Sequence, residues 1–250
     1  MTSENCFDKE FELRYFEMNN LGLATPTIML ALLEETAADH CYAINHSLFD
    51  LVKKNIGWVL VSGALQIERY PSYKEKITIR TWLSSYSTIK GYRENIIFDE
   101  NQNIIGRAKG LWVFFDIENR KPIPIFNDIK EKWGYYNEES INTNIKKKIE
   151  AIDFASHIKQ FKVNRFDTDM NKHVNNIRYL QWVIESIPED IADNYSLYEI
   201  NGRFISEAQY GDTVLSLTNT DIENDSFVHS IKIAGSDKVC ATAKTLWRKN

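Results

Sequence analysis

Cysteine is scarce in this sequence, and its three examples are Cys6, Cys41 and Cys240. They are far apart and odd in number, so they offer neither a disulfide framework nor the paired spacing of zinc ligands. We therefore expect a reducing compartment, the cytoplasm. The sequence also predicts no metal site and no cofactor.

Long hydrophobic runs and an excess of basic residues are missing as well. No segment is apolar for the length that a membrane span needs, and residues 1–8 are polar and lack the apolar core of a signal peptide. A net charge of −5 argues against nucleic-acid binding as the main activity. With 43% hydrophobic and 26% charged residues over 250 positions, the composition is that of a soluble globule with one large domain or two small ones.

What the chain does contain is a pair of similar halves. The first half opens with a strand-like stretch at 11–16, followed by Thr25 and Pro26, which make a good start for a helix running to about Ile44. Segments rich in β-branched and aromatic residues follow, with a hairpin turn predicted at 99–103. These predicted strands are 57–61, 64–67, 77–82, 95–98 and 110–115.

The second half repeats this order. A strand-like stretch at 157–163 precedes a helix that stops near Pro188, and a turn is predicted at 235–237. The apolar face of this helix is predicted to carry Val174, Ile177, Leu180 or Gln181, Ile184 and Ile187. The predicted strands are 197–205, 213–218, 227–233 and 239–247.

Local similarities occur in the same order in both halves. Residues 108–112 resemble 243–247, residues 72–77 resemble 209–214, and residues 17–19 resemble 169–171. One long helix followed by antiparallel strands, twice over, predicts an α+β protein made of two tandem hotdog domains, in each of which the sheet wraps the helix. We predict an N-terminal domain at 1–128, a polar linker at 129–155 and a C-terminal domain at 156–250. A chain with strands and helices in separate layers explains the repeat less well.

A polar cluster stands just before the second helix. Asp169, Asn171 and His173 alternate there, so an extended backbone would place their side chains on one side. The helix start would present the backbone N–H groups of Val174 and Asn175, which could stabilise an oxyanion. Residues of this kind are also common helix caps, but the cluster as a whole favours carbonyl chemistry.

This cluster carries a resemblance to a known family. Residues 169–186 resemble the active-site signature of the plant and bacterial acyl-ACP thioesterases, and further landmarks appear in family order along nearly the whole chain. The resemblance implies a tandem hotdog fold and hydrolysis of the thioester between a fatty acyl chain and acyl carrier protein (ACP). The further landmarks are 11–14, 34–37 with His40, 57–59, 68–71 and 91–93.

The same resemblance implies Asp169, Asn171, His173 and the more distant Glu207 as active-site residues. Ala208 stands where the plant relatives carry cysteine, which excludes a thiol nucleophile at that position. As a hypothesis, Asp169 and Glu207 flank the thioester carbon, and one of them activates water or attacks directly; the sequence leaves this choice open. Asn171 and the helix start would hold the carbonyl oxygen, and His173 would serve the departing thiolate.

The repeat predicts a single site in each chain. The first-half counterpart of His173 is predicted to be Leu21, and that of Glu207 to be Tyr70, so the imidazole and the later carboxylate occur only in the second half. The first half would then be free to hold the acyl chain, as the resemblance also implies.

Carrier protein is acidic, so docking should use basic residues near the motif. The candidates are Lys162, Arg165, Lys172 and Arg178. Three alternatives stay open: an acyl-CoA thioesterase of the single-hotdog type, a hotdog dehydratase, and a module that binds acyl-ACP without hydrolysing it. A homodimer and a monomer are both open, because the tandem repeat already supplies an internal pseudo-dimer.

Overall fold

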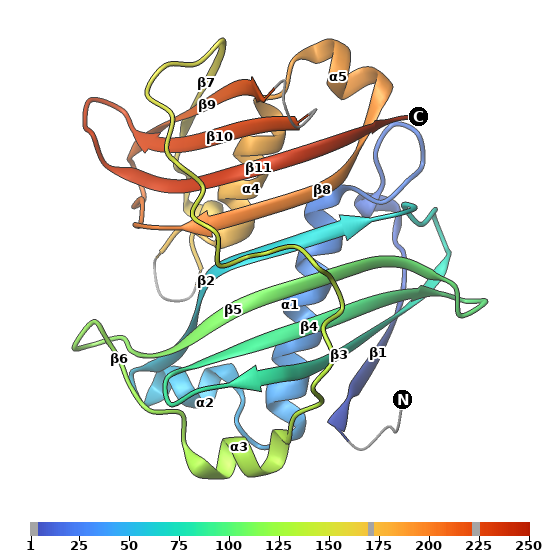
Figure 1. The fold of residues 1–250 in the computed structure, drawn as a ribbon, viewed down its shortest axis with the longest axis vertical. Coiled ribbons are helices and arrows are strands. Elements are labelled where there is room, and N and C mark those ends of the chain that lie inside the picture. Colours follow the sequence, from blue (N-terminus) through green and yellow to red (C-terminus); the bar gives the residue numbers. More distant parts are fainter. Residues whose placement is uncertain (1–4, 170–172, 222–225) are drawn as a thin grey trace. The chain divides into compact units, whose positions relative to one another are not determined.

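The computed structural model describes residues 5–169, 173–221 and 226–250 of the 250-residue chain. It divides into two compact units, Met1–Thr143 and Asn144–Asn250, called here the first and the second unit (Figure 1). Each unit contains one antiparallel sheet and one principal helix, as the repeat predicts.

The sheet of the first unit has the strand order β1-β3-β4-β5-β2, and every neighbouring pair is antiparallel. The short strand β6 pairs with β5 outside this order. The strands are β1 (Phe7–Glu12), β2 (Ile56–Ile67), β3 (Lys76–Tyr86), β4 (Lys90–Asp99), β5 (Ile104–Asp116) and β6 (Lys121–Pro122).

The principal helix of the first unit is α1, Pro26–Ala43. It begins as the sequence predicts, because the Thr25 side chain accepts a hydrogen bond from the Ile28 N–H and Pro26 occupies the first turn. The helix packs on β1 and β3 and buries Met29 and Leu32 among other residues (Figure 1). Two shorter helices complete the unit, α2 (Leu48–Lys53) and α3 (Asn127–Trp133).

The sheet of the second unit has the order β8-β11-β10-β9-β7, again with antiparallel neighbours. Its principal helix, α4 (Asn176–Glu185), packs on β9, β10 and β11. The short helix α5 (Glu189–Asn194) leads into β8. The strands are β7 (His157–Lys162), β8 (Tyr195–Phe204), β9 (Thr213–Asp221), β10 (Ser226–Ile233) and β11 (Val239–Lys249).

The tandem arrangement confirms the predicted α+β fold, with two local corrections. The stretch predicted as a strand at 11–16 is the end of β1 followed by a 3-10 turn, η2 (Tyr15–Glu17). The predicted apolar face of α4 is rotated, since Ile177 and Ile184 are only half-buried whereas Tyr179 and Trp182 are buried. The prediction counted the stripe from aliphatic residues and overlooked the aromatic rings, which cover more area.

The segment predicted as a linker begins inside the packed part of the first unit. Helix α3 starts at Asn127, and its residues Ile129 and Trp133 belong to a core cluster with Phe114 and Leu51. Beyond α3, residues 134–156 form neither helix nor strand. The change from one unit to the next falls within that segment.

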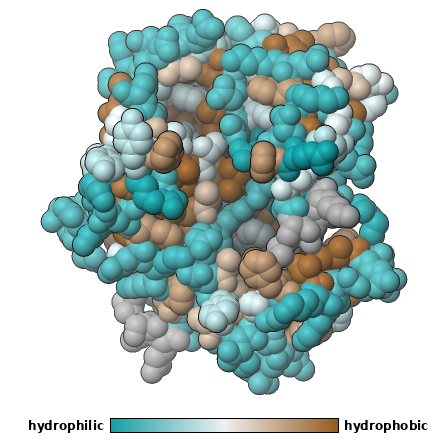
Figure 2. All heavy atoms as spheres, turned by 180° about the vertical axis from the view of Figure 1, so that it is seen from behind, coloured by the Kyte–Doolittle hydropathy of each residue, from teal (hydrophilic) through white to brown (hydrophobic). Residues whose placement is uncertain are grey.

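The surface is mostly hydrophilic on the face shown in Figure 2, with hydrophobic side chains scattered between the polar ones. In the second unit, the large hydrophobic side chains that are exposed include Phe166, Ile205 and Tyr210. None of the helices in the described part of the chain has both the length and the apolar character that a membrane span requires.

Candidate active site

The loop before α4 is closed by its own hydrogen bonds. It follows a 3-10 turn, η3 (Arg165–Asp167). The Asp169 N–H donates to the His173 carbonyl at 2.8 Å, and the His173 N–H donates back to Asp169 Oδ1 at 3.2 Å. Asp169 is therefore joined by two hydrogen bonds to the backbone of His173, whose imidazole is the candidate catalytic group. Asn171, the third predicted member of the cluster, lies outside the described residues.

The structure brings His173 and Glu207 together although they are far apart in sequence. The distance from His173 Nε2 to Glu207 Oε2 is 3.5 Å, and the side chains are 32% and 42% exposed. Glu207 follows the end of β8, and its backbone carbonyl accepts a hydrogen bond from Lys238 Nζ at 2.6 Å. A carboxylate beside an imidazole, with both reachable from solvent, can take a proton from water and pass one on.

The backbone groups at the helix start differ in their availability. The Asn175 N–H donates to the Asp167 carbonyl at 2.9 Å, and its side chain accepts from the Ile177 N–H at 2.8 Å. The prediction of Asn175 as an oxyanion donor is therefore wrong in this geometry, because its N–H is already used and the residue acts as the helix cap. The Val174 N–H makes no hydrogen bond to any residue that the structure describes.

The predicted carrier-docking residues are not equivalent either. Lys162 and Arg165 are exposed, and the Arg165 guanidinium lies 4.7 Å from the centre of the Tyr210 ring. Arg178 is engaged within the unit: Nη1 donates to Gln181 Oε1 at 2.7 Å, and other atoms of its guanidinium contact η3. Arg178 therefore ties α4 to η3. Lys172 lies outside the described residues.

The first unit contains the same loop, and this corrects the predicted alignment of the halves. The Asn19 N–H donates to the Leu23 carbonyl at 2.7 Å, and the Leu23 N–H donates to Asn19 Oδ1 at 3.1 Å. These bonds repeat those of Asp169 and His173, so Leu23 is the counterpart of His173. The predicted counterpart, Leu21, is wrong by two residues because the prediction matched similar letters instead of the hydrogen bonds of the loop.

The later segment keeps its predicted correspondence. The Ser72 N–H donates to Glu75 Oε2 at 3.0 Å, as the Gln209 N–H donates to Asp212 Oδ2 at 2.8 Å. Counting back two residues from each donor places Tyr70 opposite Glu207. The first unit thus holds Leu23 and Tyr70 where the second holds the imidazole and the carboxylate.

The loop of the first unit is also joined to this later segment by backbone hydrogen bonds. The Ala24 N–H donates to the Pro71 carbonyl at 2.8 Å, and the Tyr73 N–H donates to the Gly22 carbonyl at 3.3 Å. Val174 is the counterpart of Ala24, and its N–H has no such bond within the described residues. The N–H that joins the loop to the later segment in the first unit is therefore left without this bond in the second unit.

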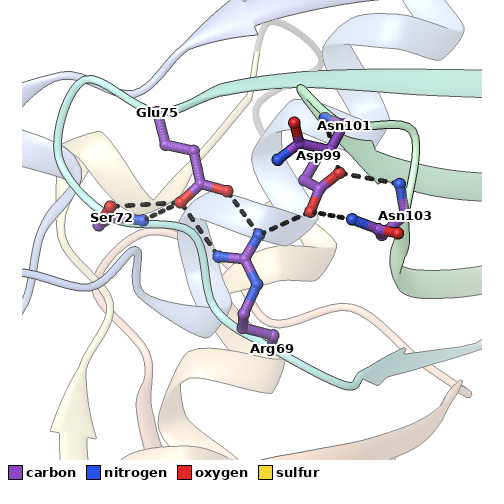
Figure 3. Close-up of polar contacts among 6 residues, drawn as sticks. All are labelled: Arg69, Ser72, Glu75, Asp99, Asn101 and Asn103. Carbon is purple, nitrogen blue, oxygen red and sulfur yellow. Dashed lines mark hydrogen bonds and ion pairs between the residues drawn. The ribbon is translucent and has the colours of Figure 1, made fainter.

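An arginine clamp further fixes the segment in the first unit. The Arg69 guanidinium donates to both carboxylate oxygens of Glu75, at 2.6 and 3.0 Å, and lies 3.4 Å from Asp99 Oδ2 (Figure 3). Asp99 in turn accepts from the hairpin residues Asn101 and Asn103. In the second unit the smaller Ser206 takes the place of Arg69, and its hydroxyl donates to the Val239 carbonyl at 2.6 Å.

One cysteine is nearer to the site than its sequence position indicates. The Cys240 carbonyl accepts hydrogen bonds from the N–H groups of Ile205 and Ser206, at 2.8 and 3.1 Å. Its side chain is fully buried, and this burial raises the pKa of the Cys240 thiol. A buried, protonated thiol is a poor nucleophile, so the proximity of Cys240 does not support a mechanism with a cysteine nucleophile.

The fold and the site together define a class of protein. Two α+β units in tandem, each with a principal helix packed on an antiparallel sheet, and the His173–Glu207 pair in the second unit make a tandem hotdog hydrolase. The chain belongs to the acyl-ACP thioesterase family. The family model described as the acyl-ACP thioesterase N-terminal domain matches residues 4–133, and the model of the C-terminal domain matches residues 138–249.

Individual relatives agree with this assignment. The chain is 28% identical to the oleoyl-acyl carrier protein thioesterase 1, chloroplastic, of Arabidopsis thaliana, over 97% of this chain and 76% of the relative. A solved acyl-ACP thioesterase from Bacteroides thetaiotaomicron has a TM-score of 0.86 at 21% identity, covering 99% of this chain and 100% of that one. A putative oleoyl thioesterase from Lactobacillus plantarum has a TM-score of 0.84 at 24% identity, covering 99% and 98%. These structures share the fold of this chain.

Proposed function

We propose that this chain hydrolyses the thioester of a fatty acyl-ACP, releasing free fatty acid and ACP in fatty acid biosynthesis, at one site in its second unit. The observation that carries the proposal is the 3.5 Å contact between His173 and Glu207. It occurs in a chain whose two halves match the two domain models of a thioesterase family. We further propose that the first unit, which lacks this pair, contributes to binding the acyl chain.

Glu207 is the general base in this mechanism. Its carboxylate removes a proton from a water molecule, and the water oxygen forms a bond to the thioester carbon. The carbonyl oxygen becomes an oxyanion, which accepts a hydrogen bond from the Val174 N–H. The oxyanion then re-forms the carbonyl as the C–S bond breaks, and the proton held by Glu207 passes through the neighbouring His173 to the departing sulfur. Water has then added across the thioester, and the products are a carboxylic acid and a thiol.

Asp169 has a positioning role in this proposal. One of its carboxylate oxygens accepts the His173 N–H, and Asn19 makes the same bond in a unit that lacks the site. The family resemblance implies Asn171 as an active-site residue, and we propose that it holds the carbonyl oxygen together with the Val174 N–H. We assign the role of base to Glu207, because its side chain lies 3.5 Å from the imidazole of His173.

Hydrolysis assays on matched substrates test this function. We expect free acid to be released from acyl-ACP, with a lower kcat/KM for the acyl-CoA of equal chain length. Glu207→Gln should lower the rate of release by about 10²–10⁴-fold while leaving acyl-ACP binding intact. Binding without release of acid by the wild-type chain would favour the carrier-binding module, and equal kcat/KM on both substrates would favour the acyl-CoA alternative.

Recognition of the acidic carrier is proposed to use Lys162, at the end of β7, and Arg165, at the start of η3, which are both exposed. Charge reversal, Lys162→Glu with Arg165→Glu, should raise KM for acyl-ACP several-fold but leave acyl-CoA turnover unchanged. Raising the salt concentration should weaken the same interaction, because exposed charges are screened. A KM for acyl-ACP that does not change with salt would exclude these residues as the docking site.

The compartment is proposed to be reducing, and we infer the cytoplasm. All three cysteines are free thiols, and Cys41 and Cys240 are buried.

A further inference from the structure

Tyr179 is a buried residue of α4 that contacts the segment carrying Glu207. Its hydroxyl oxygen accepts a hydrogen bond from the Ala208 N–H at 2.8 Å, and the residue is only 2% exposed. The ring is held at 5.4 Å from Trp182 and 6.1 Å from Phe204, measured between ring centres. The hydroxyl therefore sits at a fixed point and meets the backbone one residue beyond the catalytic carboxylate.

The first unit lacks both partners of this hydrogen bond. Met29 stands four residues after the cap of α1, as Tyr179 stands four after the cap of α4, and Met29 has no hydroxyl. Pro71 is the counterpart of Ala208, and proline has no N–H to donate. The donor and the acceptor are thus present together in the unit with the site and absent together in the unit without it.

We propose that Tyr179 is a positioning residue that fixes Glu207 against His173 by holding the Ala208 N–H. This inference rests on the proposed role of Glu207 as the base. The peptide group between Glu207 and Ala208 is held at both of its polar atoms, by Lys238 Nζ at the Glu207 carbonyl and by Tyr179 at the Ala208 N–H. Ala208 is fully buried, so loss of the Tyr179 hydroxyl leaves the Ala208 N–H without a hydrogen-bond partner, and water cannot replace it. The segment must then shift to satisfy that N–H, and the carboxylate moves with it.

The first test measures backbone protection and turnover in Tyr179→Phe. We expect hydrogen exchange of the Ala208 amide to accelerate by about tenfold or more, with the amides of β8 and β11 unchanged. In the same variant kcat should fall by about tenfold or more while KM stays within about twofold, because the lost interaction orients the base and does not bind substrate.

The second test removes the donor instead of the acceptor. Ala208→Pro introduces the residue that the first unit has at this position, Pro71. In that background position 208 has no N–H, so Tyr179→Phe leaves no donor without a hydrogen bond. Its effect on kcat should then shrink to less than about twofold, which is a coupling that a loss of core packing would not produce. Pro71 shows that proline is accepted at this register of the fold.

Two results would overturn the proposal: unchanged Ala208 exchange in Tyr179→Phe, or the same loss of kcat in the Ala208 and Ala208→Pro backgrounds. The exchange measurement uses no substrate, so it reports on positioning whether or not Glu207 is the base. Failure of the proposed role of Glu207 would appear elsewhere, as full turnover in Glu207→Gln, and failure of the proposed function would appear as no release of free acid by the wild-type chain.

Discussion

At the residue scale, Asp169 and Glu207 have different surroundings, although the sequence leaves open which of them is the base. Asp169 bonds to the backbone N–H of His173, while Glu207 faces its imidazole. In the first unit the side-chain amide oxygen of Asn19 accepts the corresponding hydrogen bond, from the Leu23 N–H. Charge at position 169 is therefore not required for the loop, whereas the proposed mechanism requires charge at position 207 for proton removal.

This difference predicts unequal effects of two isosteric substitutions. Glu207→Gln should lower kcat by about 10²–10⁴-fold, the range for loss of a general base. Asp169→Asn should lower it by less than about tenfold, because an asparagine makes the same bond in the first unit. Release of free acid from acyl-ACP measures both, with the Tm as a control for folding. The reverse order of effects would assign the base to Asp169.

A second residue-scale prediction concerns the position where plant relatives carry cysteine. Ala208 is fully buried, so a thiol placed there would be shielded from water and from substrate. We expect Ala208→Cys to keep kcat within about twofold of wild type, since a buried thiol is mostly protonated and unreactive. A gain of more than tenfold, together with inactivation by a thiol reagent, would show that the thiol takes part.

At the scale of elements, the same start serves both principal helices. Thr25 caps α1 and Asn175 caps α4, each through a side-chain oxygen that accepts an N–H of the first turn. Only the cap of α4 adjoins the candidate catalytic residues. The two helices therefore offer a matched pair of changes, one beside the site and one away from it.

Replacing each cap by alanine should separate stability from catalysis. Asn175→Ala and Thr25→Ala should each lower the free energy of unfolding by about 1 kcal/mol, the usual value of such a cap. Only Asn175→Ala should also lower kcat, because the loop that holds His173 is attached to this helix start. Urea unfolding and free-acid assays on both variants measure the effects. Equal kcat values in the two variants would contradict this assignment.

At the scale of the whole molecule, each unit buries one neutral histidine. His40 bonds to Arg93 through Nδ1 at 3.1 Å, and His229 lies between Thr218 and Thr245 at 2.9 and 2.8 Å. Burial, with the Arg93 charge as a lesser cause at His40, lowers the pKa of each to about 3. Both units should therefore respond to acid in the same direction.

The expected response is a loss of stability as pH falls from about 6.5 toward 3. The unfolded chain binds a proton at each histidine below its ordinary pKa, whereas the folded chain excludes it, so unfolding becomes easier. Between pH 7 and pH 5 the loss should be about 2 kcal/mol for each histidine. Urea unfolding at the two pH values measures it, and His229→Gln should show a smaller loss than wild type. Equal losses would mean that His229 is not excluded from protonation.

The sequence alone determined the repeat, the principal helices and most strands, because these follow from periodic apolar residues and local caps. Thr25 with Pro26 predicts the start of α1, and the strands predicted at 213–218 and 227–233 are found as β9 and β10. The motif around His173 and the separate Glu207 were predicted from a family resemblance. These features are local, or are carried by a recognisable signature.

Only the tertiary structure decided which of these groups meet. The contact of His173 with Glu207, the use of the Asn175 N–H by Asp167, and the bond from Ala208 to Tyr179 all join residues of different elements or loops. Their formation depends on how α4 packs on its sheet, which no local pattern encodes. The sequence thus determined which chemical groups the chain has, and packing decided which of them remain available for catalysis.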